Sequence, residues 1–255
     1  MNKLLFKIND CFGNLGVSSN YEWNKRIDDK YSIYDPEDDR LFDAISKSGQ
    51  KAALACALIV FEGIVLRVSK NNDLLDIHQW LEALWAGTID SLYIKGLKCD
   101  YKKFRLTVDR EIGPLSASIY TLSLAVKRYT SKSYYVHNRL INLLLLFRHI
   151  TPDRKVFDSW LSSTLKKMAT LAPCPYNYDD LDLSSDSDEE EEYDSTEEII
   201  LPREFFINPG YIYTESSARA EIQQFLQSLD YQNNPYLCSP EEMFSNGFRG
   251  NPYTL

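Results

Sequence analysis

Apolar side chains recur every three to four residues along most of the chain, and almost no segment alternates apolar with polar residues. The first spacing is that of an α-helix, and the second is that of a half-buried strand. The clearest helical pattern begins at Gln50, where Leu54, Leu58 and Phe61 share one side and small residues fill the others. Such a helix is apolar nearly all round and belongs in the centre of a fold. The pattern predicts an all-α protein, an irregular helical bundle of about six to eight helices.

The boundaries of the predicted helices come from this spacing and from capping residues, prolines and glycines at their ends. The predicted helices span 36–48, 50–70, 73–93, 114–129, 133–150, 153–171 and 214–229. Ser239 followed by Pro240 predicts one more short helix, which Gly247 ends. A turn-bounded apolar patch is expected at 204–210.

One acidic run dominates the charge of the chain. Residues 179–198 contain twelve carboxylates and neither lysine nor arginine. The whole chain has a formal net charge of −9, so the rest of it carries −9 + 12 = +3. Blocks of like charge repel one another and stay solvated. The predicted organisation is therefore an N-terminal arm (1–34), a helical core (35–172), an acidic mobile segment (173–200) and a C-terminal helical segment that packs on the core (201–255).

The middle of the chain is basic. Residues 95–167 contain fifteen Lys or Arg against five acids, a local net charge of +10, with Tyr101 and Phe104 interleaved. Such a surplus is suited to a phosphate backbone or to an acidic protein. Solvated faces on several helices explain the same surplus equally well.

Residues that often carry chemistry lack the spacing that chemistry requires. The three histidines, His78, His137 and His149, show no metal-ligand spacing and are expected on the surface or at helix caps. Ser163 and Lys166 match S-x-x-K without its companion motifs. Asp109 and Glu111 are more simply explained as charges on a solvated loop. The sequence therefore predicts no enzyme, no catalytic residue, no metal and no cofactor.

Cysteine usage and hydropathy indicate a compartment. The five cysteines lie far apart, without a C-x-x-C pair, as is usual for reduced thiols in the cytosol. The apolar region near the N-terminus is too short for a signal peptide. The longest apolar stretch, 52–68, contains Glu62 and Arg67, which favours a buried helix over a membrane span. A cytoplasmic protein without membrane contact is expected.

The C-terminal tail carries a resemblance to a known group of proteins. Its sequence, residues 234–253, is N-P-Y-L-C-S-P-E-E-M-F-S-N-G-F-R-G-N-P-Y, and it follows a helical body. It resembles the end of bacterial helical immunity proteins, which neutralise polymorphic toxins or toxins of type VI secretion. The resemblance implies a cytoplasmic protein that binds one cognate toxin, often a nuclease, and blocks its active site. It transfers no catalytic residues.

Two functions follow as hypotheses. The first is an immunity-type inhibitor that binds the basic active-site surface of a cognate toxin by protein–protein contact, aided by the acidic segment. Its predicted contact residues are the acids Asp186, Asp188, Glu189, Glu190, Glu191, Glu192 and Asp194 and the apolar anchors Phe205, Phe206 and Tyr211. The alternative is a nucleic-acid-binding module that uses the basic 95–167 region, with the acidic segment as a self-masking arm. Its predicted contact residues are Lys98, Lys102, Lys103 and Arg105.

Overall fold

The computed structural model describes residues 8, 11–13, 15–16, 21–32, 38–68, 75–95, 110, 112–176 and 192–255. The regular structure in these ranges is helical. No β-strand occurs in these ranges, so the all-α prediction is confirmed. The elements are α2 (Lys25–Ser32), α3 (Asp39–Ile45), α4 (Gln50–Val68), α5 (Leu75–Ile89), the short 3₁₀ helix η1 (Ser91–Tyr93), α6 (Gly113–Thr130), α7 (Val136–Ile150), α8 (Arg154–Leu171), α9 (Arg203–Ile207), α10 (Glu215–Ser228) and α11 (Pro240–Ser245).

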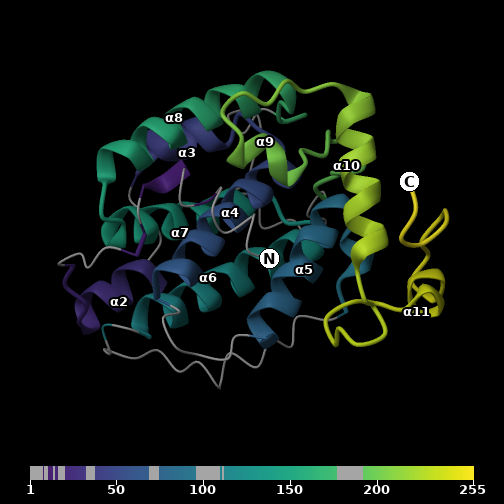
Figure 1. Ribbon diagram of the computed structural model, residues 1–255, viewed down its shortest axis with the longest axis horizontal. Coiled ribbons are helices and arrows are strands. Elements are labelled where there is room, and N and C mark those ends of the chain that lie inside the picture. The colour runs from purple at the N-terminus through teal and green to yellow at the C-terminus, as the bar shows by residue number, and fades with distance from the viewer. Residues whose placement is uncertain are drawn as a thin grey trace.

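Helix α4 lies at the centre of the fold, as its uniformly apolar sequence predicts. Helices α5, α6, α7 and α9 pack against it (Figure 1). Its close packing requires a glycine at position 63. A Cβ there would lie 2.9 Å from a ring carbon of Phe147 and 3.0 Å from one of Phe12. Phe12 belongs to the predicted N-terminal arm, so this arm contributes to the core.

The other helices surround this core in two groups. Helix α6 packs along α7, α2 lies against both, and α3 and α8 cover α7 (Figure 1). The C-terminal part forms a smaller apolar cluster on α5, in which Ile222 and Leu226 of α10 meet Ala83 and Ala86. Tyr93 joins the tail to this cluster, since its hydroxyl accepts a hydrogen bond from the Tyr253 N–H at 3.1 Å.

Capping residues explain where several helices begin. Asp153 accepts hydrogen bonds from two backbone amides of α8, and Thr214 caps α10. Ser239 and Glu242 form the reciprocal capping box of α11, and Gly247 beyond its end has a φ of +92°. These caps satisfy amides that have no partner inside the helix.

Three predicted elements differ from the observed ones. The helix expected at 36–48 is observed over Asp39–Ile45 with Asp38 as its cap, and residues 33–37 lie outside the described residues. The helix expected at 73–93 divides near Asp90, whose carboxylate caps η1. The predicted apolar patch is the helix α9. Five residues are too few for a helical repeat to be recognised in sequence.

None of the helices in the described ranges combines the length and the apolar character needed to cross a bilayer. Helix α4 satisfies the length, but Glu62 and Arg67 are buried within it against protein partners.

Candidate functional site

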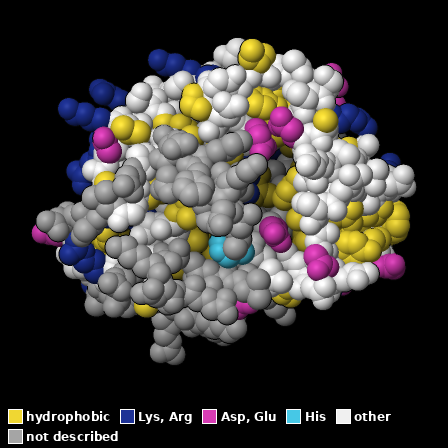
Figure 2. All heavy atoms as spheres, in the orientation of Figure 1, with side chains coloured by type: hydrophobic (Ala, Val, Ile, Leu, Met, Phe, Trp, Pro, Cys, Tyr) yellow, Lys and Arg dark blue, Asp and Glu magenta, His cyan; other side chains and the backbone are white. Residues whose placement is uncertain are grey.

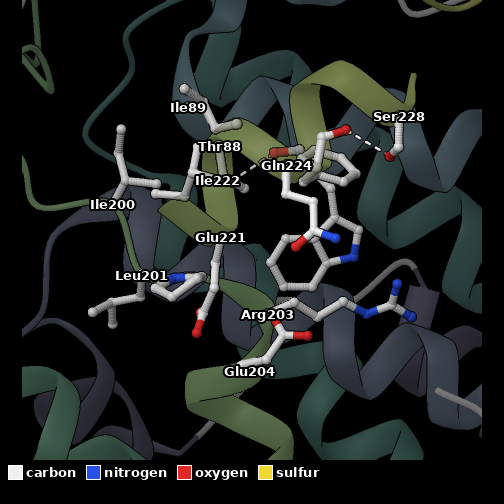
Figure 3. Close-up of a pocket in the computed structure, with 13 residues that line it drawn as sticks. Thr88, Ile89, Ile200, Leu201, Arg203, Glu204, Glu221, Ile222, Gln224 and Ser228 are labelled. Carbon is white, nitrogen blue, oxygen red and sulfur yellow. Dashed lines mark hydrogen bonds between the residues drawn. The ribbon is translucent and has the colours of Figure 1, made fainter. Parts of the chain in front are cut away.

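A cavity of about 310 Å³ lies between α5, α9 and α10 (Figure 3). Cavities of this size hold small organic ligands, since such sites range from about 300 to 1,000 Å³. Its walls are largely apolar, and its polar groups come from α9, from α10 and from Thr88. The lining residues are Trp85, Thr88, Ile89, Ile200, Leu201, Pro202, Arg203, Glu204, Glu221, Ile222, Gln224, Phe225 and Ser228.

A buried carboxylate, that of Glu62, holds two residues of the cavity lining, Arg203 and Trp85. Glu62, only 3% exposed, receives a hydrogen bond from Arg203 Nη2 on one carboxylate oxygen. Its other oxygen receives one from Trp85 Nε1 at 2.7 Å. The Arg203 guanidinium also stands 5.8 Å from the centre of the Trp85 ring, a distance at which a cation is attracted to the ring face. These contacts attach α9 to α4 and α5.

Electrostatics around this pair follow from burial. Burial raises the pKa of Glu62, an effect that Arg203 and the Trp85 N–H oppose. The pKa of His78 is lowered, first by burial and then by the charge of Arg203. Burial also raises the pKa of Glu82, whose carboxylate accepts a 3.4 Å hydrogen bond from Asn234 Nδ2. The ion pair therefore lies in a partly buried polar region at the edge of α5.

Two carboxylates lie at the end of the cavity next to α9, on Glu204 and Glu221 (Figure 3). The Tyr211 hydroxyl donates a 3.0 Å hydrogen bond to Glu221 Oε2. Burial is the main cause of the raised pKa of Tyr211, and the charges of Glu221 and Glu204 add to it.

On the face shown in Figure 2, Asp and Glu side chains lie over α5 and α9, whereas Lys and Arg gather along the edge over α8 and α2.

A second feature of interest is the base of the acidic run, where two distant points of the chain meet. The rings of Tyr176 and Tyr193 are 4.8 Å apart, and Tyr134 of the helical body contacts both at 5.3 Å. The Tyr176 hydroxyl accepts a hydrogen bond from the Asp194 N–H at 3.2 Å. Tyr176 and Tyr193, which are far apart in sequence, therefore lie side by side on the helical body.

The last acid of the run, Glu198, caps the central helix. Its carboxylate oxygens accept hydrogen bonds from the Gln50 N–H at 2.9 Å and the Lys51 N–H at 2.7 Å. The Tyr193 hydroxyl donates a third, at 2.5 Å. Residues 173–176 and 192–200, assigned from sequence to the mobile segment, therefore pack on the helical core. The sequence does not show this role, because a capping carboxylate 148 residues away looks like any other acid of the run.

The predicted contact residues fall into three groups. Asp186, Asp188, Glu189, Glu190 and Glu191 lie outside the described residues, as do Lys98, Lys102, Lys103 and Arg105. Glu192 and Asp194 are exposed, and Glu192 forms a 2.5 Å ion pair with Lys132. Tyr211 is half-buried, whereas Phe205 and Phe206 are buried and face the core of the chain instead of solvent. The two phenylalanines therefore hold α9 in place and are not exposed anchors for a partner.

No protein-family model, curated protein or solved structure matches this chain. Residues 234–253, the tail on which the expected resemblance rests, have structural roles here. Asn234 donates a 2.8 Å hydrogen bond to the Gln79 carbonyl, and the Tyr253 hydroxyl donates one to the Cys238 carbonyl at 2.5 Å. These contacts fix the tail to α5 and to itself.

The residues considered for catalysis do not form a reactive group in the described part of the chain. Ser163 and Lys166 are exposed on α8, and Asp109 and Glu111 lie outside the described residues. No group of three His, Cys, Asp or Glu side chains in the described ranges is placed to hold a metal ion.

One histidine prediction is wrong, because His137 is fully buried. Its Nε2 lies 3.0 Å from the Ser48 carbonyl oxygen, to which the neutral ring donates. Burial lowers the pKa of His137 to about 4, although this hydrogen bond opposes the change. The carbonyl that it meets belongs to the turn between α3 and α4, so the ring connects α7 to that turn.

The protonation of His137 predicts a pH dependence of stability. In the unfolded chain a histidine takes up a proton as the pH falls below about 6.5, whereas folded His137 stays neutral to about 4. The unfolded state then binds more protons, so stability falls as the pH falls through this window. This group should lower the free energy of unfolding by about 2 kcal/mol between pH 7.5 and pH 5. Urea unfolding of the wild type and of His137→Gln at both pH values measures this loss of stability. The variant should lose about 2 kcal/mol less than the wild type between the two pH values. An identical loss in both proteins would contradict the prediction.

Proposed function

We propose that this protein is an immunity-type inhibitor, which binds a cognate bacterial toxin by protein–protein contact and neutralises it. The single observation that carries the proposal is the contact between Tyr176 and Tyr193 at the base of the acidic run. The contact of Tyr176 with Tyr193 holds residues 176 and 193 together on the helical body. The fifteen residues between Tyr176 and Glu192 contain eight carboxylates and no Lys or Arg. The residues on either side of this negatively charged stretch therefore lie together on the helical body.

Concentrated negative charge suits a partner with a basic surface, such as the nucleic-acid groove of a nuclease. Long-range attraction raises the rate at which such partners meet, to about 10⁸ M⁻¹s⁻¹ at low salt. Apolar contacts near the charge then slow dissociation. Ile199 directly follows the capping acid Glu198 and is 39% exposed. Because Phe205 and Phe206 are buried, we assign Ile199 as the apolar residue that contacts the partner.

The test removes five of the twelve negative charges of the run without disturbing its base. Asp186, Asp188, Glu189, Glu190 and Glu191 are changed to the matching amides, while 192–198 are kept because Glu198 caps α4. The binding partner used is the protein encoded next to this chain, co-expressed with it. We expect the wild type to form a complex and to protect the cells, and the variant to associate at least about tenfold more slowly at low salt. Stopped-flow association at several salt concentrations measures this.

A matched variant tests whether the association rate depends on where the five charges are removed or only on how many are removed. Five exposed acids elsewhere are changed to amides, giving the same net charge: Asp39, Asp43, Asp76, Glu215 and Glu241. This control should associate at nearly the wild-type rate. Equal rates for all three proteins, or a neighbouring gene product that is neither toxic nor bound, would contradict the proposal.

A second function is favoured by one contact. Glu192 of the acidic run pairs with Lys132, which belongs to the basic 95–167 region, and the Tyr193 N–H donates to the Lys132 carbonyl at 2.8 Å. The run therefore meets the basic region within one molecule, as a self-masking arm of a nucleic-acid-binding module would. Under this alternative, the five-amide variant should bind a fluorescent oligonucleotide more tightly than the wild type, with an affinity that falls steeply as salt rises. Absence of binding by both proteins at low salt would exclude it.

A further inference from the structure

The lining of the cavity between α5, α9 and α10 is negatively charged although it contains an arginine. Glu62 neutralises Arg203 inside the core. The other charged residues of the lining are Glu204 and Glu221, both carboxylates. Figure 3 shows these two side chains at the same end of the cavity. Charge complementarity therefore favours a ligand with a positive group at that end.

The hydroxyl groups of the lining are already used as donors. Thr88 Oγ1 donates a 2.8 Å hydrogen bond to the Trp85 carbonyl, and Ser228 Oγ donates one of 2.7 Å to the Phe225 carbonyl (Figure 3). Carboxylates only accept hydrogen bonds when they are ionised. At the end of the cavity that holds Glu204 and Glu221 the lining therefore offers acceptors, and a ligand group that supplies N–H donors fits that end.

The walls are suited to the apolar part of such a ligand. Ile89, Ile222 and Leu201 contribute aliphatic surface, and Trp85 and Phe225 contribute aromatic surface. Aromatic rings attract cations as well as apolar groups. The exposed residues Gln224 and Ser228 lie at the edge of the cavity, which gives a ligand access from solvent.

We propose that this cavity binds an organic cation with an apolar body, whose guanidinium, amidinium or ammonium group meets Glu204 and Glu221 while its carbon skeleton packs between Trp85 and Phe225. The ligand is either a free small cation or an arginine side chain of a partner protein. The inference does not depend on the proposed inhibitor function, because it concerns the cavity alone.

Three small molecules of one shape test the sign of the charge. Benzamidine is a cation, benzamide is neutral and benzoate is an anion, and each is titrated into the full chain by calorimetry. Benzamidine should bind at least about tenfold more tightly than the other two, because charge-assisted hydrogen bonds are roughly twice as strong as neutral ones. The double variant Glu204→Gln, Glu221→Gln should lose about tenfold of this affinity. Glu215→Gln, on the exposed side of α10, removes an acid of the same helix outside the cavity and should bind benzamidine as the wild type does.

Two further measurements complete the test. Ser228→Trp places a large ring at the cavity edge and should weaken benzamidine binding; equal unfolding midpoints show that each variant is folded. N-acetyl-arginine amide distinguishes an arginine side chain of a partner protein from a free small cation. If it binds as well as benzamidine, the ligand is a partner's side chain. If benzamidine alone binds, the ligand is a free cation. Stronger binding of benzoate would assign the cavity to an anion held by Arg203 and overturn the proposal. No binding of benzamidine at millimolar concentration, or equal binding by the double variant, would overturn it too.

Discussion

Replacing Glu62 with alanine is expected to lower the free energy of unfolding by about 3–5 kcal/mol, the loss usual when one partner of a buried ion pair is removed. The change leaves the Arg203 guanidinium partly buried without its counter-charge, and it leaves the Trp85 indole N–H without its acceptor. Folded domains are stable by only about 5–15 kcal/mol. Urea unfolding followed by circular dichroism should therefore show a much lower midpoint with an unchanged dependence on denaturant.

Two variants separate the charge of Glu62 from its hydrogen bonds. Glu62→Gln keeps an acceptor for the Trp85 N–H and should cost less than the alanine variant. Glu197→Ala removes an exposed acid and should change the stability by less than about 0.5 kcal/mol. A loss below about 1 kcal/mol in Glu62→Ala would show that water replaces the carboxylate and that the pair does not hold α9 in place.

This ion pair also connects stability to the cavity. Arg203 lines the cavity, and Phe205 and Phe206 follow it in α9 and fill the core. If Glu62 is lost, the charge of Arg203 is no longer neutralised in the core, so it offsets part of the negative charge of Glu204 and Glu221 and weakens the preference for cations. Benzoate binding to Glu62→Gln should then increase relative to the wild type. The same residue thus stabilises the fold and sets the charge that a ligand meets.

The long helices could be predicted from sequence because each carries its own apolar period. The pattern of α4 indicates a central position without knowledge of its neighbours, and the capping residues Asp153 and Ser239 mark helix starts locally. The short helix α9 could not be predicted this way, since its position depends on burial of Phe205 and Phe206 by the rest of the chain.

The candidate site is hidden from sequence for a different reason. Glu62 and Arg203 are 141 residues apart, and neither has a local sequence signal that identifies its partner. Glu62 in an apolar helix indicates only that the helix is not a membrane span. The buried partner that explains the charge comes from an element that the periodicity does not reveal. Tyr176 and Tyr193 likewise have no local signal that brings them together.

Replacing Glu198 with alanine is the second change with a large expected effect, a loss of about 2–4 kcal/mol. The variant removes the acceptor of two amides at the start of α4 and that of the Tyr193 hydroxyl. An unsatisfied buried group costs about 1–3 kcal/mol. It also removes the negative charge that most strongly favours protonated Lys51, a residue that is 7% exposed and whose pKa is lowered by burial. Thermal and urea unfolding measure the loss, with the exposed neighbour variant Glu197→Ala as its control.

Gly49 offers an independent test of the same cap. A Cβ at position 49 would lie 2.5 Å from the Glu198 carboxyl carbon, so Gly49→Ala must displace the carboxylate from the amides of Gln50 and Lys51. The displacement itself is inexpensive because the carboxylate ends a flexible side chain, and the cost comes from the lost hydrogen bonds. Gly49→Ala should therefore destabilise the wild type but have little further effect in the Glu198→Ala background, since the two changes remove one interaction. Additive losses in this double-mutant cycle would mean that Glu198 does not cap α4, and the base of the acidic run would then depend on the tyrosine contacts alone.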